Sequence, residues 1–283
     1  MKRKYDEPTS RPSSFILPSK RLGQHFLRDP RTITRIVEAF APTRDETVLE
    51  IGPGTGALTA ELVESAGRVV AIEFDNKLAP LLQQRFGARS NFKLVQGDAL
   101  NIDFCAEVLP ATSARLVANL PYNISTAILQ RLIAQRSCLT EMLVMLQREV
   151  VERILAPAGS RDRGFLSVLV EAYCEKEKLF DVAPGSFRPP PKVWSSVMRL
   201  MFRPKLELEL GDEVLLWQLV SAGFAQKRKT MLNNLRQASG RLQEVIKQNG
   251  GASIVLCKAG VDVQRRAETL TVDDWVRIVR AMK

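Results

Sequence analysis

Histidine and cysteine are scarce in this chain of 283 residues, which limits the chemistry open to it. The single histidine, His25, excludes a multi-histidine metal site and leaves one candidate for a histidine-based nucleophilic triad. Four cysteines lie 33, 36 and 83 positions apart with no CxxC pair: Cys105, Cys138, Cys174 and Cys257. We therefore expect no metal centre, and we expect core thiols in a reducing compartment rather than disulfides.

Long apolar runs are also missing. No run approaches the roughly 20 residues that a membrane span requires. The N-terminus is basic, but its apolar patch covers only residues 15–17, which is too short for a signal peptide. With 45% hydrophobic residues, the chain can still form a substantial core. We expect a globular, cytoplasmic protein with no membrane contact.

The net charge of +10 is carried by the two ends of the chain. Residues 1–31 and 203–283 each have an excess of five basic residues, whereas residues 32–202 contain 19 basic and 19 acidic ones. Basic ends around a neutral body favour a polyanionic partner. The alternative is that the charge only keeps the protein soluble. Two basic clusters are candidates for binding the polyanion, which would be RNA under the resemblance described below, although each alone is more typical of a solvated face: Lys227, Arg228 and Lys229, and Arg265 and Arg266.

The predicted elements divide the chain into three parts. Residues 1–19 contain several prolines and serines and are expected to form a flexible basic arm. Residues 20–203 alternate strand and helix patterns, which predicts an α/β fold whose mostly parallel sheet has helices on both faces. Residues 204–283 show helical patterns, and we expect them to form a smaller helical domain.

A glycine loop follows the first predicted strand of the sheet. Residues 47–51 lead into the loop of residues 52–56 (GPGTG), where glycines permit a tight turn and close approach of a ligand. The next predicted strand ends at Glu73, 21 positions after Gly52, where a nucleotide-binding fold places a carboxylate for ribose hydroxyls. Pro53 removes an amide that a pyrophosphate would use. S-adenosylmethionine, which has a ribose and no pyrophosphate, fits this pattern.

Two further predicted strands end in polar side chains. Asp98 follows residues 92–95, and Asn119 follows residues 115–118. Because strand ends in an open α/β sheet face the ligand crevice, Asp98 could accept a hydrogen bond from an adenine amino group. Asn119 begins an Asn-Leu-Pro-Tyr stretch, whose proline restricts the backbone around Leu120. Alone, this stretch is more typical of a strand that ends in a turn, with Tyr122 as a packed loop aromatic.

A stiff loop at residues 184–193 includes three consecutive prolines and is expected to present one aromatic side chain, Phe187. The predicted strand after it, residues 195–202, is expected to close the sheet.

Five stretches together resemble one family. They are residues 22–27 (LGQHFL), 50–56 (EIGPGTG), 119–122 (NLPY), 187–193 (FRPPPKV) and 266–270 (RAETL). From about residue 20 to its C-terminus the chain resembles the ribosomal RNA adenine-N6,N6-dimethyltransferases. Its helical tail is more similar to the branch that acts on the small ribosomal subunit than to the 23S rRNA branch. The resemblance implies a Rossmann-like class I methyltransferase sheet of seven strands, in a protein expected to be a monomer.

The resemblance also implies an activity: dimethylation at N6 of two adjacent adenines in the 3′-terminal hairpin of 16S rRNA, with a role in maturation of the small subunit. S-adenosylmethionine would be the donor and S-adenosylhomocysteine the product. The alternatives are methylation of 23S rRNA and a ribosome assembly factor that acts mainly by binding.

Site residues follow from the resemblance position by position. Many members of the family carry asparagine where this chain has His25, so a backbone contact is expected there. The implied cofactor-binding residues are His25, Leu27, Gly52, Gly54, Glu73, Asp98 and Asn119. The implied catalytic residues are Asn119, Leu120, Pro121, Tyr122 and Phe187, with the two aromatic rings stacking on the target base.

Overall fold

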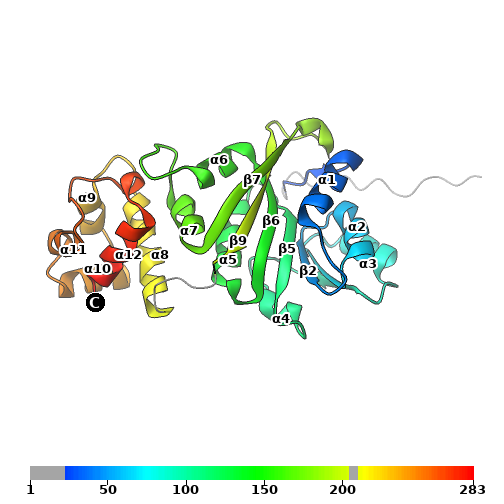
Figure 1. Cartoon of the computed structure of the whole chain (residues 1–283), viewed down its shortest axis with the longest axis horizontal. Helices are drawn as coiled ribbons and strands as arrows, with labels where there is room; N and C mark the ends of the chain where they lie inside the picture. Colours follow the sequence, from blue (N-terminus) through cyan, green and yellow to red (C-terminus); the bar gives the residue numbers. More distant parts are fainter. Residues whose placement is uncertain (1–22, 204–209) are drawn as a thin grey trace, which may run out of the picture.

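The computed structural model describes residues 23–203 and 210–283 (Figure 1). The expected arm of residues 1–19 lies outside these ranges. One sheet has the strand order β4-β3-β2-β5-β6-β9-β7, and β9 is antiparallel to both of its neighbours while the other pairs are parallel. The mostly parallel sheet of seven strands is thereby confirmed. Its strands are β2 (Thr47–Ile51), β3 (Arg68–Glu73), β4 (Phe92–Gln96), β5 (Ala114–Asn119), β6 (Leu139–Gln147), β7 (Cys174–Val182) and β9 (Ser195–Phe202).

Helices cover both faces of the sheet, as predicted. Successive strand residues point to opposite faces, so Val48 and Val117 pack in one core and their neighbours Leu49 and Leu116 in the other. The first core lies under α1 (Pro30–Phe40), α2 (Ala57–Ser65) and α3 (Ala79–Phe86). The second lies under α4 (Phe104–Val108), α5 (Ser125–Ala134), α6 (Arg148–Leu155) and α7 (Phe165–Tyr173).

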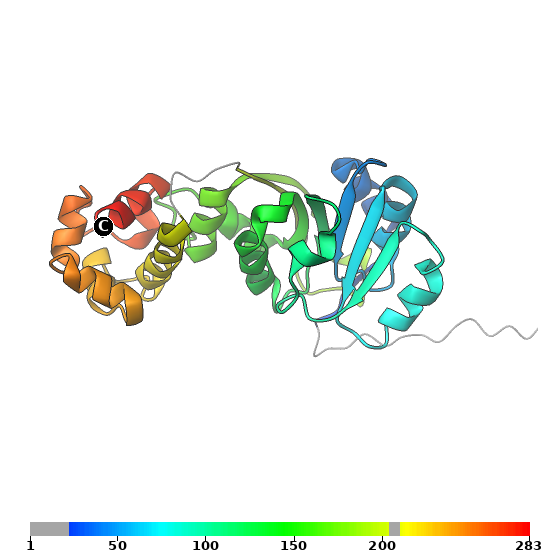
Figure 2. The same cartoon turned by 90° about the horizontal axis from the view of Figure 1, so that it is seen from below.

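The C-terminal helices gather at the end of the molecule opposite to α2 and α3 (Figures 1 and 2). Their core surrounds Trp275, which is fully buried, and it includes Val168 from α7. Because α7 contributes side chains to this C-terminal core and to the second core of the sheet, the division of the chain at residue 203 stays a prediction. The helices are α8 (Leu210–Phe224), α9 (Met231–Arg236), α10 (Gly240–Gln248), α11 (Ala252–Lys258) and α12 (Val272–Arg280). Within the described ranges, no helix has the length and apolar character needed to cross a membrane.

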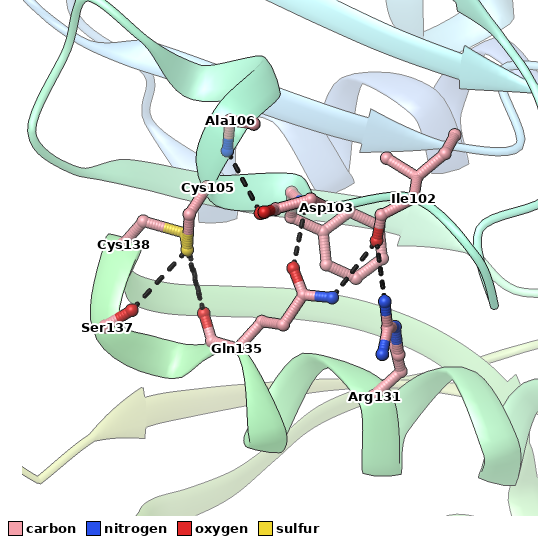
Figure 3. Close-up of a disulfide and its surroundings, with 9 residues drawn as sticks. Ile102, Asp103, Cys105, Ala106, Arg131, Gln135, Ser137 and Cys138 are labelled. Atoms are coloured by element: carbon pink, nitrogen blue, oxygen red, sulfur yellow. Dashed lines mark hydrogen bonds between the residues drawn. A yellow bond between two sulfur atoms is a disulfide. The ribbon is translucent and has the colours of Figure 1, made fainter.

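A disulfide joins Cys105 in α4 to Cys138, which follows α5 (Figure 3). The expectation of four core thiols is therefore wrong for this pair. It is also wrong for Cys257, which is exposed, and holds only for Cys174, whose thiol pKa is raised to about 12 by burial. The linear sequence gave no signal, since the pairing depends on how α4 packs against the end of α5.

Gln135 holds these two elements together beside the disulfide (Figure 3). Its side-chain oxygen accepts a hydrogen bond from the Phe104 amide at 2.7 Å, and its side-chain nitrogen donates to the Ile102 carbonyl at 3.0 Å. The start of α4 is thus attached to α5 independently of the sulfur atoms.

Reduction of the disulfide should lower the free energy of unfolding. A crosslink that closes a loop of 33 residues restricts the unfolded chain, and such a constraint contributes about 2–4 kcal/mol. Urea denaturation with and without dithiothreitol measures the difference. The double variant Cys105→Ala/Cys138→Ala should show no further response to the reductant, and an equal response in both proteins would exclude this bond as the cause.

Candidate functional site

The carboxyl-terminal edge of the sheet borders a cavity of about 280 Å³. Parallel strands end at the same edge, so the loops after β2, β3, β4 and β5 converge there, and residues 23–27 form a further wall. Of the predicted site residues, the cavity brings together His25, Leu27, Gly52, Gly54, Glu73, Asp98, Asn119, Leu120, Pro121 and Tyr122.

The glycine loop requires glycine for its backbone conformation. Gly52 and Gly54 have φ values of 70° and 60°, in the left-handed region that other residues rarely adopt. A β-carbon at Gly54 would also lie 3.0 Å from the ring of Phe26. The loop can therefore turn tightly and leave its backbone accessible to a ligand.

Glu73 is a buried carboxyl between two loops. It accepts hydrogen bonds from the Gly54 amide at 3.0 Å and from the Asp75 amide at 2.8 Å. Burial raises its pKa. A carboxylate has about four acceptor positions, so two remain that could receive ribose hydroxyls.

Asp98 orders the next loop of the cavity. Its two oxygens accept hydrogen bonds from the Leu100 amide at 2.9 Å and from the side chain of Asn101 at 3.2 Å. The side chain is half-buried, so it remains accessible from the cavity. This is consistent with an adenine-binding role, which stays a prediction.

Asn119 has a defined orientation at the end of β5. Its side-chain nitrogen donates to the His25 carbonyl at 3.1 Å. Because the nitrogen is used in this way, the side-chain oxygen is left as an acceptor. The backbone carbonyl of His25 thus helps to form the site by orienting Asn119. The expected contact of His25 with a cofactor stays a prediction.

The Leu-Pro-Tyr segment is held by backbone hydrogen bonds before and after the Leu120 carbonyl. The Leu120 amide donates to the Met145 carbonyl, and the Ile124 amide donates to the Pro121 carbonyl, both at 3.2 Å. Together with the proline ring, these bonds restrict the direction of the Leu120 carbonyl.

Tyr122 is packed between His25 and Ser195. Its hydroxyl lies 2.5 Å from the Ser195 hydroxyl, and burial raises the tyrosine pKa. The His25 ring stacks on Tyr122 with ring centroids 5.4 Å apart, and His25 Nδ1 lies 2.8 Å from the Pro189 carbonyl. Nδ1 therefore carries the proton and donates to this carbonyl.

Phe187 is not brought to the cavity. It is 4% exposed and belongs to β8 (Phe187–Arg188), which pairs antiparallel with β1 (Phe26–Leu27). The expectation that this loop presents Phe187 is wrong, because pairing with β1 turns the ring into the core under α1. Stacking of Phe187 on a base stays a prediction, and it would require the ring to leave this core.

Sequence reasoning missed the role of Glu50 in the cavity wall. Glu50 is 2% exposed, and burial raises its pKa to about 8. One of its oxygens accepts a hydrogen bond from the Thr59 hydroxyl at 2.7 Å. A glutamate in the middle of an apolar strand was the signal that could have identified it.

The two basic clusters of the C-terminal part lie side by side. The Met231 amide donates to the Arg265 carbonyl at 2.8 Å, which joins the loop before α9 to the segment before α12. Arg265 forms an ion pair with Asp274 at 3.1 Å, so it also has a structural role. The exposed members form what we call the basic patch: Lys227, Arg228, Lys229 and Arg266.

Comparison with known proteins gives matches along nearly the whole chain. Residues 18–282 match the family described as ribosomal RNA adenine dimethylase. Ribosomal RNA small subunit methyltransferase A of Pseudomonas putida is 42% identical over 259 residues, 92% of each protein. The protein of that name from Nitrosococcus oceani is 42% identical over 262 residues, 92% of this chain and 94% of its own length.

Two solved structures share the architecture and more than a quarter of the sequence. A dimethyladenosine transferase from Plasmodium falciparum has a TM-score of 0.72 and 28% identity, covering 90% of this chain and 96% of its own. The 23S rRNA methyltransferase ErmE has a TM-score of 0.63 and 27% identity, covering 91% and 99%. The cavity and the basic patch both fall within the residues that match the family.

Glu50→Gln should flatten the dependence of stability on pH. The glutamate pKa rises from 4.5 to about 8 on folding, so folding takes up a proton between these values. The contribution to stability is complete below pH 4.5 and is lost as the pH rises through about 8. Between pH 6 and 8 the free energy of unfolding should fall by up to about 1.4 kcal/mol per pH unit, and by less in the variant.

Urea denaturation at pH 6, 7 and 8 measures this slope. Glutamine still accepts the Thr59 hydrogen bond, and Glu64→Gln, at an exposed position, serves as the control. Parallel slopes for the wild type and Glu50→Gln would contradict the assignment.

Proposed function

Because this chain belongs to the ribosomal RNA adenine dimethylase family, we propose that it dimethylates N6 of two adjacent adenines in the 3′-terminal hairpin of 16S rRNA. The observation that carries this proposal is the orientation of Asn119, whose nitrogen is bound to His25 and whose oxygen is left to accept from the target amine. Relatives about 40% identical are named for the small subunit, which favours 16S rRNA over 23S rRNA.

The residues present fit S-adenosylmethionine. The glycine loop leaves its backbone accessible, buried Glu73 can accept from ribose hydroxyls, and Asp98 can accept from the adenine amino group. When bound, the cofactor supplies an electrophilic methyl group on sulfur and leaves as S-adenosylhomocysteine.

The protein's main task is to prepare a poor nucleophile. The lone pair of adenine N6 is delocalised into the ring, so it is weakly available for attack. The Asn119 side-chain oxygen and the Leu120 carbonyl can accept hydrogen bonds from the two N6 hydrogens, which favours a pyramidal nitrogen. Since backbone bonds and Pro121 restrict that carbonyl, the acceptors are positioned before substrate arrives. Once the N–C bond to the methyl group has formed, N6 releases one proton to water.

The target base must leave its stack to reach this cavity. Tyr122 offers an aromatic surface beside Asn119, and a base that stacks on such a ring gains about 1–3 kcal/mol. The ring is held by Ser195 and His25, so stacking requires little further ordering of the side chain.

The proposed partner is 16S rRNA within the small ribosomal subunit, bound by a protein monomer in the cytoplasm during subunit maturation. The basic patch supports an RNA partner, since exposed cations can neutralise backbone phosphates.

Experiments can distinguish this function from the two alternatives, methylation of 23S rRNA and assembly of the subunit by binding alone. Transfer of radiolabelled methyl groups to 30S and 50S particles from unmethylated cells should label 30S particles; labelling confined to 50S particles would indicate a 23S rRNA acceptor. An assembly factor that acts mainly by binding would restore subunit maturation equally well with an inactive site.

Asn119→Ala should abolish methyl transfer, because it removes the acceptor for one N6 hydrogen. Cofactor affinity should stay within a factor of about ten, since Glu73 and Asp98 are unchanged. Methylation of 30S particles and calorimetric titration of cofactor measure the two effects. Asn76→Ala, an exposed position outside the cavity, is the control, and near-normal turnover of Asn119→Ala would refute the proposed role.

Charge reversal of Lys227, Arg228 and Lys229 to glutamate should weaken RNA binding and flatten its salt dependence. Each phosphate contact contributes about 0.7–0.9 to the magnitude of the slope of log K against log salt, so the loss of three contacts should reduce that magnitude by up to about 2–3. Binding titrations at several salt concentrations test this. Reversal of the exposed Arg241, Lys247 and Lys258, which changes the net charge equally, is the matched control. An unchanged slope in the Lys227, Arg228 and Lys229 variant would leave the basic patch without an RNA role.

A further inference from the structure

Trp194 is an exposed aromatic residue next to the residue that holds the active-site tyrosine. Its side chain is 45% exposed, and the adjoining Val193 is 44% exposed. The next residue, Ser195, is fully buried and contacts the Tyr122 hydroxyl at 2.5 Å. Trp194 belongs to none of the three cores, so its indole and the side chain of Val193 form a small exposed apolar surface beside Ser195.

The backbone at Trp194 is held, and the ring lies beside a cation. The Arg148 amide donates to the Trp194 carbonyl at 2.9 Å. The Arg148 guanidinium lies 6.0 Å from the centre of the Trp194 ring and 3.6 Å from the Glu152 carboxylate. Because the contact with Glu152 is long and exposed, Arg148 can turn to a phosphate at little cost.

Strand pairing places this group at the same edge of the sheet as Asn119. Asn119 pairs with Met145 of β6, and Gln147, two residues further along β6, pairs with Ser195. β5 and β9 are separated by two strand spacings, or about 10 Å. Trp194 therefore lies at the edge of the sheet that borders the cavity, one residue from the Ser195 hydroxyl that contacts Tyr122. RNA that flanks a flipped base in the cavity would pass along this edge.

Several cations lie near this aromatic surface, together with the carboxylates of Glu149, Glu152 and Asp181. Arg148, Arg188 and Lys192 are all exposed on the elements that lead to or contact Trp194. Aromatic rings with neighbouring cations are the combination that binds unpaired nucleotides, through stacking on the base and contact with the phosphate.

We propose that Trp194 and Arg148 form a stacking platform for the unpaired nucleotide next to the target adenine. The base stacks on the indole, and its phosphate contacts the Arg148 guanidinium. This inference rests on the proposed function, because it takes the substrate to be RNA with one adenine in the cavity. The platform keeps the flanking base unstacked from the RNA helix while the adjacent target adenine is methylated.

Trp194→Ala should raise the KM for 30S particles by about 5- to 150-fold, the loss expected for one stacked base, with little change in kcat. Trp194→Phe should recover most of the affinity, because it keeps an aromatic face. Arg148→Gln should raise KM and reduce the salt dependence of binding. Met201→Ala, which removes a 49% exposed side chain at the far end of β9, is the matched control.

A direct measurement is independent of methyl transfer. In a hairpin RNA with 2-aminopurine next to the target adenine, the wild type and Trp194→Phe should quench the probe on binding, whereas Trp194→Ala should not. Equal quenching by Trp194→Ala overturns the platform, and so does a loss of kcat with unchanged KM, which would show that Trp194 only positions Tyr122 through Ser195. Failure of the wild type to methylate 30S particles would instead refute the proposed function, while the quenching result would still stand.

Discussion

The parallel pairing of β2 with β3 and β5, and of β3 with β4, is the constraint on which the site depends. It aligns Ile51 with Ile72 and Ala118, and Glu73 with Gln96, so that the strands end together. Side chains alternate between the two faces of a sheet, and a shift of one residue in β5 would turn Asn119 away from His25. Packing on both faces of the sheet therefore determines the catalytic geometry.

The buried carboxyls in the cavity wall lower the stability of the folded chain, and a cationic ligand can offset this loss. Glu50 and Glu73 are both buried there, and burial raises the pKa of each. The hydrogen bonds that the two carboxyls accept offset the cost of burial only in part, since the pKa of each remains raised. Buried carboxyls with a raised pKa in the wall of a cavity are typical of binding sites. The proposed methyl donor is a cation, and its binding would favour the charged form of both groups.

Local patterns in the sequence were sufficient to predict the sheet, the glycine loop and three polar strand ends, because these depend on neighbouring residues. Features that depend on distant contacts were not predictable. Phe187 is buried because β8 pairs with β1. In this pairing Phe187 lies opposite Leu27, which is 160 positions earlier in the chain. The disulfide and the joining of the two basic clusters likewise arise from tertiary packing. Glu50 was overlooked although its local pattern was visible.

The bond between Asn119 and the His25 carbonyl has a consequence for how this sequence can vary. Every amino acid has the same backbone oxygen, so no single substitution at position 25 deletes the partner of the Asn119 amide. The side chain at position 25 can therefore differ while the hydrogen bond that orients the Asn119 amide is retained. What the His25 ring contacts, namely Tyr122 and the Pro189 carbonyl, is thus separable from what its backbone orients.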